Sequence, residues 1–413
     1  MAGNIIGFAR VALMAYLLGT GSLADSLAVA IGPIDTLNSV LINSMVFAFV
    51  PMLTAREGTQ RTGLFLGLNR YFAGLFSLLA VALVLLAPWF VRMLAPGLEP
   101  AWFDTAVINF RVLSCSIPAA GMASIHSALL YTDRRFAPSA FNQATLNLFT
   151  VTGALATWQV LGVHGFALGY SVGAWVQLAV VWWCARSGLQ TRGLPEVGIH
   201  WRELLAKPLS IALFAGGLAA NITFTRAYAT HAGPGVAAAL DYCMRGVGVP
   251  LAFLVSPISN SLLPEIARLR SQSRLREAYL LIDRTIALAA LAAVGVCAFA
   301  LALREPAIRL LFERGSFTPE STTMVSAVFL GLGPAMIGWS LLELTSRSLF
   351  SLDRTWLPVT AAFIPLVFNV LLTLWVRDPQ PHLIGLGASL GLLAGFAVLF
   401  GLARSSRRTQ PQT

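Results

Sequence analysis

Eight of the charged residues that stand inside or at the edge of long apolar stretches of this sequence are candidates for chemistry. They are Arg10, Arg111, Arg226 and Arg245, with Asp25, Asp35, Asp241 and Glu343. A charged side chain at the centre of a membrane helix costs at least about 2.5–3.5 kcal/mol, so each one needs a partner or a function. A guanidinium binds phosphate through its planar set of N–H donors. The predicted chemistry is therefore capture of an anionic, phosphate-bearing ligand.

Arg245 and Arg10 are the two best candidates for phosphate ligands. Arg245 follows Asp241 by one helical turn, and this spacing predicts an ion pair within one helix. A half-neutralised guanidinium that faces a cavity can still accept phosphate, so both interpretations stay open. Arg10 has no acidic partner in its own segment. It is either a phosphate ligand or a residue that snorkels from a helix end to the interface.

The other polar residues in these stretches have simpler explanations. Arg111 and Arg226 lie close enough to segment ends that we expect both side chains to snorkel. Asp25 follows a glycine-containing turn and is a candidate N-cap of the next helix. Asn38 and Asn43 form a polar face that serves either hydrogen bonding between helices or a substrate pathway.

No pattern in the sequence predicts enzymatic catalysis, a cofactor or a metal. The five histidines are dispersed, and no P-loop or metal-ligand spacing occurs. The four cysteines stand in apolar segments without C-x-x-C spacing, and we expect them to be small core residues. An ion gradient or the membrane potential is then the expected energy source. Asp35, Asp241 and Glu343 are candidates for ion or proton coupling.

The composition predicts how these residues are positioned. Of 413 residues, 57% are hydrophobic and only 11% are charged, against about 25% charged in soluble domains. The mean hydropathy is +0.74. Apolar runs of the length that crosses a bilayer as a helix recur from end to end. The alternating pattern of a membrane β-barrel does not occur. We therefore predict an all-α, polytopic membrane helix bundle.

We expect about twelve membrane spans in two lobes of six. The spans are approximately residues 2–18, 27–53, 64–94, 106–131, 139–160, 166–185, 209–229, 236–266, 279–303, 322–350, 356–376 and 383–403. The expected domains are an N-terminal lobe (1–190), an amphipathic linker (191–207), a C-terminal lobe (208–404) and a basic tail (405–413). The first span is short, as if the chain began inside a longer helix, and no cleavable signal peptide is expected.

The basic residues predict the orientation. Alternate loops divide them roughly 19 against 5, so the positive-inside rule places both termini in the cytoplasm. The net charge of +10 belongs to this pattern. No basic stripe with interleaved aromatic residues occurs, so nucleic acid is not an expected partner. We expect a monomer whose partners are membrane lipids and an anionic lipid-linked substrate.

Two short motifs occur twice. D-R-x-aromatic-x-P stands at Asp133–Pro138 and again at Asp353–Pro358. An apolar segment with a central proline ends the second span at Pro51 and the eighth at Pro264. The two copies of each motif are separated by similar numbers of residues, and they lie at equivalent places in the first six and the last six spans. The sequence therefore predicts duplicated halves with parallel topology, as in several transporter folds.

Several motifs together resemble a known family. They are Gly7-Phe8-Ala9-Arg10, Leu18-Gly19-Thr20-Gly21, Ala24-Asp25, Phe49-Val50-Pro51, Arg134-Arg135-Phe136-Ala137-Pro138, Leu262-Leu263-Pro264 and Leu311-Phe312-Glu313-Arg314-Gly315-Ser316-Phe317-Thr318. The chain resembles the MurJ/MviN lipid II flippases through these motifs. The resemblance covers nearly the whole chain, and the last motif, L-F-x-x-G-x-F-T, is its most specific part.

The resemblance implies a fold, a function and a set of site residues. The fold is MATE-like, with two pseudo-symmetric lobes of six helices around a cationic cavity and an alternating-access cycle. The function is translocation of an undecaprenyl-diphosphate-linked saccharide, lipid II, from the cytoplasmic to the periplasmic leaflet of the bacterial inner membrane. Arg10 and Arg245 would hold the diphosphate, and Asp25 corresponds to an aspartate of the family. Asn38 and Asn43 would complete the substrate site.

The sequence also departs from the family pattern. Asn4 stands where the family has a second arginine in span one, Asn38 and Ser39 where it has an arginine pair, and Asn43 where it has an acid. The family commonly has two more helices. Three alternatives therefore stay open: export of another polyprenyl-linked oligosaccharide such as an O-antigen or capsule unit, cation or drug antiport through Asp35, Asp241 and Glu343, and a non-transporting scaffold.

Overall fold

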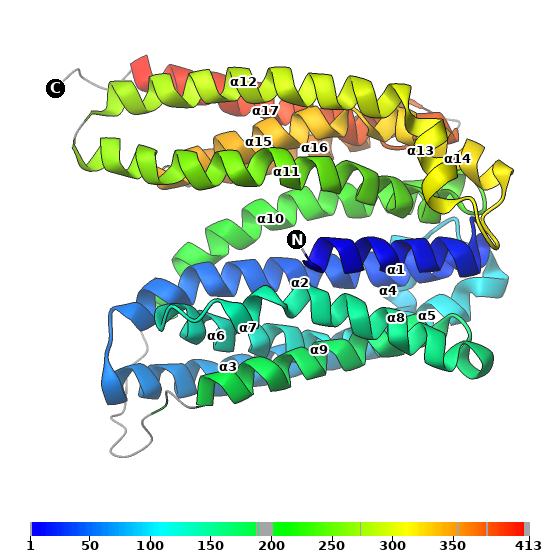
Figure 1. Ribbon diagram of the computed structural model, residues 1–413, viewed down its shortest axis with the longest axis horizontal. Helices are drawn as coiled ribbons and strands as arrows, with labels where there is room; N and C mark the ends of the chain where they lie inside the picture. Colours follow the sequence, from blue (N-terminus) through cyan, green and yellow to red (C-terminus); the bar gives the residue numbers. More distant parts are fainter. Residues whose placement is uncertain are drawn as a thin grey trace. The chain divides into compact units, whose positions relative to one another are not determined.

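The protein is a bundle of long helices, as the composition predicts (Figure 1). The computed structural model describes residues 2–186, 189, 201–272, 274–352, 354, 356–376 and 379–408. The chain is 88% helical, and no strand occurs in that described part. Among the described residues, seven helical stretches are long and apolar enough to cross a membrane, or eight if one bent pair counts as a single span. The all-α membrane fold is confirmed.

The chain divides into two compact units. The first comprises Met1–Met14 and Ser22–Ala212, and the second comprises Ala15–Gly21 and Leu213–Thr413. Helix α1 (Ala2–Leu18) therefore contributes to both. Residues 191–200 of the expected linker lie outside the described residues, as do residues 409–413 of the expected tail. The rest of that linker begins helix α10.

The first unit holds most of α1 and the helices up to α9. They are α2 (Ser22–Thr54), α3 (Gly58–Leu85), α4 (Ala87–Leu94), α5 (Pro100–Ser114), α6 (Ile117–Thr132), α7 (Ala137–Ala140), α8 (Asn142–Leu161) and α9 (His164–Ala185). Helix α6 lies at its centre, in contact with α2, α3 and α9.

The second unit holds α10 from Leu213 onward and all of the later helices. They are α10 (Trp201–Ala229), α11 (Val236–Ser271), α12 (Leu275–Ala302), α13 (Arg304–Phe312), α14 (Pro319–Leu332), α15 (Ala335–Ser351), α16 (Trp356–Trp375) and α17 (Leu386–Arg408), with short 3-10 turns η2 (Thr230–Ala232) and η3 (Pro381–Leu383). Here α15 lies at the centre, in contact with α11, α12 and α17.

The lengths of successive helices repeat between the units. Helices α3 and α4 have 28 and 8 residues, and α12 and α13 have 28 and 9. Helices α8 and α9 have 20 and 22 residues, and α16 and α17 have 20 and 23. The two halves therefore carry the same series of elements, as the repeated motifs predict.

The repeat extends to a break in one span of each unit. Helices α5 and α6 are separated by Cys115 and Ser116, and α14 and α15 by Gly333 and Pro334, where the axis bends by 43°. Both broken spans begin with a proline, whose missing N–H costs nothing in the first turn. A second proline lies at or just after each break: Pro118 follows the first break, and Pro334 is part of the second. Neither proline can continue the preceding helix.

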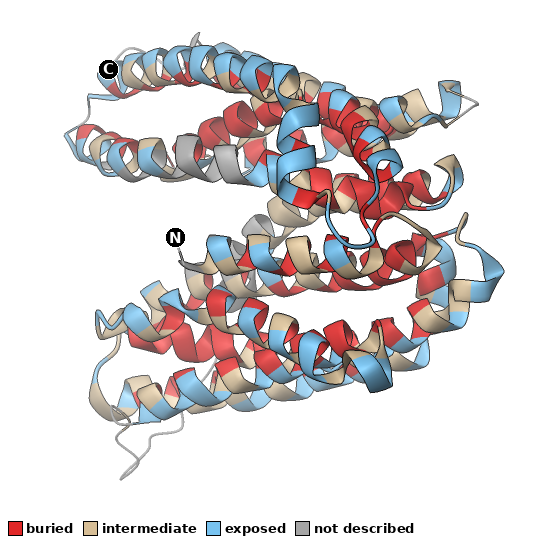
Figure 2. Cartoon of the chain, turned by 45° about the vertical axis from the view of Figure 1, so that its right-hand side comes forward, coloured by how far each residue is buried: buried red, intermediate tan, exposed pale blue. Residues whose placement is uncertain are grey.

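Each unit buries the helix faces that meet their neighbours and exposes large apolar side chains outward (Figure 2). Leu78 and Leu288, both 68% exposed, are examples on α3 and α12. In water such side chains would be unfavourable, but in a bilayer they meet lipid tails that are equally apolar. Helix packing in this medium depends on close contact rather than on the hydrophobic effect.

Helices α8 and α9 achieve this contact through glycines. A Cβ atom added at Gly169 would lie 2.4 Å from the carbonyl oxygen of Phe149 and 3.1 Å from the Cα atom of Gly153. A Cβ atom added at Gly153 would lie 2.6 Å from the Cα atom of Gly169. Because these neighbours are backbone atoms, they cannot move aside without separating the helices. The two backbones pack as in other small-residue membrane interfaces.

We expect Gly169→Ala to destabilise the protein by about 1–3 kcal/mol, the usual cost of overpacking a close contact. The measurement is the thermal unfolding midpoint of the purified full chain in detergent. Gly74→Ala is the matched control, because Gly74 is also helical and no atom lies within 4 Å of its added Cβ. Equal midpoints for the two variants would show that the α8–α9 contact does not limit stability.

Candidate functional site

The first unit buries an arginine from α1 against an aspartate of α2. Arg10 is only 4% exposed, and its Nη2 donates a hydrogen bond of 3.1 Å to Oδ2 of Asp35. Asp35 retains 21% exposure of its side chain. Snorkelling of Arg10 to an interface is thus not observed, because a carboxylate within the unit supplies the compensating charge.

A chain of hydrogen bonds continues from this ion pair. The Tyr170 hydroxyl of α9 donates to Oδ1 of Asp35 at 3.0 Å. The Asn38 amide donates to that hydroxyl at 3.3 Å and to the Ser116 hydroxyl at 3.0 Å. Ser116 in turn donates to the carbonyl of Leu113 at 2.6 Å, at the end of α5. The network therefore joins α1, α2, α9 and the break between α5 and α6.

Local sequence explains how these side chains converge. Asp35 and Asn38 are three residues apart and so lie on one face of α2. Ser116 lies in the break, where the carbonyls of Val112 and Leu113 accept side-chain donors in addition to the backbone N–H groups three residues further on. Tyr170 is fully buried among the spans, and a buried tyrosine hydroxyl requires a polar partner.

The ion pair leaves part of the Arg10 guanidinium unsatisfied. Its Nε and Nη1 atoms are buried and have no hydrogen-bond partner among the residues that the structure describes. Oδ1 of Asn38 is likewise buried without a hydrogen-bond partner among these residues. A buried donor without a partner is costly, and more so when it belongs to a charged group. Arg10 therefore retains the capacity to bind a further anionic or carbonyl oxygen.

The second unit contains a parallel ion pair. Arg226 of α10 is 5% exposed, and its Nε and Nη2 lie 3.1 and 2.6 Å from Oδ1 of Asp241 on α11. The expectation that Arg226 snorkels is wrong, because the short turn η2 brings the end of α10 against the start of α11. Arg245, one turn further along α11, is half-buried. Asp241 thus has a partner that spacing along one helix did not predict.

The remaining predicted site residues lie in separate places. Asp25 is buried in the first turn of α2, which begins at Ser22, so the expected N-cap role is wrong. Its carboxylate still interacts favourably with the positive end of the helix dipole. Glu343 forms an ion pair with Arg347 one turn along α15. Asn43 is a helical residue of α2, but its side chain lies outside the described residues.

The L-F-x-x-G-x-F-T motif has a structural role within the second unit. Ser316 N–H donates to the carbonyl of Tyr16 at 2.8 Å, and the Tyr242 hydroxyl donates to the carbonyl of Gly19 at 2.8 Å. The rings of Phe312 and Phe317 each lie 5.9 Å from that of Tyr242. The motif thereby binds the turn that follows α1.

Glycine is required at two positions of this contact. Gly315 has φ 63°, and an added Cβ would lie 2.5 Å from the Tyr16 carbonyl oxygen. Gly19 has φ 59°, and an added Cβ would lie 2.2 Å from the carbonyl oxygen of Ser316. Both residues combine left-handed backbone with contact to another backbone, which only glycine permits.

One expectation about the cysteines needs correction. Cys243 and Cys297 are buried as expected, but Cys115 is exposed beside the α5–α6 break and Cys184 is half-buried. Arg111 is exposed on α5, and its Nε donates to the carbonyl of Val84 on α3 at 3.2 Å. Within the described ranges, no three His, Cys, Asp or Glu side chains are grouped as a metal site requires.

Three residues that contribute to the two ion-pair sites were not predicted from the sequence. Tyr170 and Ser116 belong to the Asp35 network, and Arg226 is the partner of Asp241. A tyrosine within an apolar span is a usable signal, because its hydroxyl needs a buried partner. No sequence signal identified Ser116 or paired Arg226 with Asp241, since these contacts depend on how separate helices pack.

We expect Asp35→Asn to destabilise the protein by about 3 kcal/mol, because it leaves the Arg10 charge buried and unpaired. Tyr170→Phe removes one hydrogen bond and should cost about 1 kcal/mol. Thermal unfolding of the purified variants in detergent measures both. The double variant Arg10→Gln/Asp35→Asn should be more stable than Asp35→Asn alone. Additive losses in this cycle would show that the two side chains are not energetically coupled.

Comparison with known proteins identifies the family. A family model described as lipid II flippase MurJ matches residues 14–413, so Arg10 precedes the matched range. A probable lipid II flippase MurJ of Rhizobium meliloti (strain 1021) is 29% identical over 400 residues, which are 91% of this chain and 72% of that protein. The lipid II flippase MurJ of Burkholderia cenocepacia is 25% identical over 432 residues, covering 96% of this chain and 81% of that protein.

Solved structures show the same fold. A structure described as lipid II flippase MurJ in an inward closed conformation matches 97% of this chain and 86% of its own, with TM-score 0.85 and 18% identity. An inward-facing MATE-family multidrug transporter of the MOP superfamily matches 100% and 96%, with TM-score 0.78 and 13% identity. The fold is that of a transporter, and the expectation of a MATE-like bundle is confirmed. This chain therefore belongs to the MurJ family of lipid II flippases, membrane transporters of the bacterial inner membrane rather than enzymes.

Proposed function

We propose that this chain translocates lipid II, an undecaprenyl-diphosphate-linked saccharide, from the cytoplasmic to the periplasmic leaflet by alternating access. The observation that carries the proposal is the family match over residues 14–413. The shared fold, with TM-score 0.85 to a MurJ structure, supports it. The other polyprenyl-linked oligosaccharides considered from the sequence have no comparable support.

The unsatisfied guanidinium of Arg10 supports a role in diphosphate binding. Asp35 occupies only one of its three nitrogen atoms, through a single bond of 3.1 Å. A diphosphate offers several charged oxygens and can supply two parallel bonds to one guanidinium. In our proposal Asp35 balances the Arg10 charge when substrate is absent, and the diphosphate replaces or joins it when substrate binds.

Arg245 is the cation that we assign to the substrate in the second unit. It is half-buried on α11, one turn from the Arg226–Asp241 ion pair. The family resemblance implies that Arg245 holds the substrate diphosphate, and its partial exposure on α11 is compatible with that role.

The acidic residues fit counter-ion roles better than cation transport. Asp35, Asp241 and Glu343 are bound to Arg10, Arg226 and Arg347, respectively. A carboxylate that is neutralised by a guanidinium attracts a cation only weakly. Cation antiport therefore has no support from the contacts of these residues. The three carboxylates remain the candidates for ion or proton coupling of flippase activity.

The orientation that we propose places both termini in the cytoplasm. It is supported by the excess of arginine and lysine in alternate loops. Arg268 and Arg270, in the last turn of α11, belong to the cytoplasmic group in this proposal. A membrane potential then acts on any charge that the transporter moves, at about 2.3 kcal/mol per charge per 100 mV.

We expect Arg10→Gln/Arg245→Gln to abolish rescue of a bacterial strain depleted of its lipid II flippase, whereas the wild-type chain restores growth. Loss of one charge-assisted contact costs about 1.5–3 kcal/mol, so each single variant should bind lipid II roughly ten- to a hundredfold more weakly. Native mass spectrometry of the purified variants with lipid II measures that binding.

The matched control is Arg276→Gln, which removes an exposed arginine of α12 and should rescue normally. Membrane abundance is measured for every variant, because Arg10→Gln also breaks the ion pair with Asp35. The variant Arg10→Lys/Arg245→Lys retains both charges and should rescue in part. Full rescue by the double glutamine variant at wild-type abundance would rule out the two arginines as substrate ligands.

A further inference from the structure

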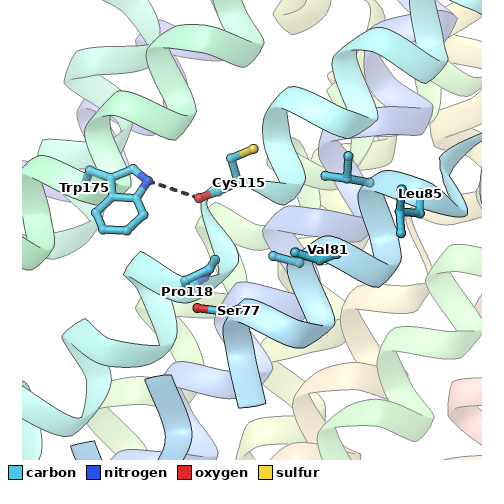
Figure 3. A pocket seen from close by; sticks show the side chains of 8 residues that line it. Ser77, Val81, Leu85, Cys115, Pro118 and Trp175 are labelled. Atoms are coloured by element: carbon cyan, nitrogen blue, oxygen red, sulfur yellow. Dashed lines mark hydrogen bonds between the residues drawn. The ribbon is translucent and has the colours of Figure 1, made fainter. Parts of the chain in front are cut away.

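An apolar groove runs along the outer surface of the first unit, beside the α5–α6 break (Figure 3). One part has a volume of about 320 Å³ and lies between α3 and the break. The adjoining part, about 610 Å³, lies between α5 and α9 and shares Cys115 and Trp175 with the first. Both volumes fall within the range of about 300–1,000 Å³ that is usual for ligand pockets.

The walls of this groove are mostly apolar, and two backbone carbonyls beside it accept hydrogen bonds from side chains. The Trp175 indole donates to the carbonyl of Cys115 at 3.1 Å (Figure 3). Ser171 donates to the carbonyl of Val112 at 2.6 Å. Val81 and Trp175 are 54% and 50% exposed. Since α3, α5–α6 and α9 are all candidate membrane spans, this surface meets lipid.

A guanidinium lies at one end of the groove. Arg111 is one turn before Cys115 on the exposed face of α5, and its Nε is held by the carbonyl of Val84, a groove residue. No carboxylate pairs with Arg111 in the part of the chain that the structure describes. A positive charge on a lipid-facing surface therefore remains without a counter-charge from these residues, which is costly in a bilayer.

The direction and length of the groove match a lipid chain that starts at Arg111. Hydrogen bonds join Asn109 to His164, Val112 to Ser171 and Cys115 to Trp175, so α5 and α9 run parallel. The groove residues of α9 extend from Leu168, beside Val112, to Ala179. These residues rise about 16 Å along the helix, close to half of a hydrocarbon core of about 30 Å.

We propose that this groove is a binding site for an anionic phospholipid, whose phosphate contacts Arg111 and whose acyl chain lies along α9 past Trp175. The two free guanidinium nitrogens provide the paired donors that a phosphate accepts. The mostly apolar walls contact an acyl chain and offer few polar groups to a saccharide. No groove residue belongs to the Arg10 network of the first unit, and the proposed lipid takes part in no step of transport.

The test is retention of dioleoyl phosphatidylglycerol by the purified full chain, measured by native mass spectrometry over a lipid titration. We expect one lipid to bind tightly, and Arg111→Gln to weaken that binding about tenfold, the loss of one charge-assisted contact. Val81→Trp should weaken it too, because the added ring fills the groove. Unfolding midpoints of both variants should stay close to wild type, since Arg111 and Val81 are exposed.

Two matched controls separate this site from general attraction to membranes. Arg92→Gln removes another exposed arginine of the first unit, which stacks on Phe103, and Leu78→Trp enlarges an exposed α3 residue outside the groove. Neither should change the affinity. Equal weakening by Arg92→Gln, or no weakening by Arg111→Gln, would overturn the proposal. So would equally tight binding of dioleoyl phosphatidylcholine, or one-for-one displacement of phosphatidylglycerol by undecaprenyl diphosphate.

Discussion

A guanidinium buried in a helix bundle requires a negative charge within reach, and this requirement shapes the first unit. Arg10 lies where water cannot solvate it, so α1 must approach α2 closely enough for Asp35 to reach its Nη2 atom. Asp35 in turn needs further donors, and Tyr170 of α9 supplies one. The charge of a single residue thus fixes contacts among three helices.

The second unit also pairs a buried arginine with an aspartate of the next helix. An arginine of α10 binds an aspartate of α11, just as an arginine of α1 binds an aspartate of α2. The two pairs occupy the first and second spans of halves whose helix lengths repeat. Neither arginine is fully satisfied, because Nη1 of Arg226, like Nη1 of Arg10, has no partner among the described residues. A bundle that transports an anion can use such incompletely satisfied cations in both halves.

The break between α5 and α6 connects the interior of the first unit with its lipid-facing surface. Ser116 turns inward and joins the network of Asn38 and Asp35, whereas its neighbour Cys115 faces outward onto the apolar groove. Two adjacent residues can do this because the helix is interrupted between α5 and α6. The break in the helix therefore places two adjacent residues on two different surfaces of the first unit.

The sequence alone determined the class of the protein, its duplicated halves and its family. Apolar runs of membrane length predict helices, because a backbone in lipid must satisfy its hydrogen bonds internally. The repeated D-R-x-aromatic-x-P motif predicts two equivalent halves, and the glycine of L-F-x-x-G-x-F-T stands where a positive φ requires it. These properties depend on local pattern and composition, so they can be recognised without coordinates.

Only the tertiary structure decided which charges are paired. Helical spacing placed Asp241 beside Arg245, but packing also brings Arg226 of α10 to it, and Asp35 meets an arginine 25 positions away in the sequence. The roles of Tyr170, Ser116 and Cys115 likewise depend on which helix lies next to which. An ion pair between helices depends on their separation and rotation, and in a bilayer these follow from packing of whole surfaces rather than from the spacing of residues along one helix.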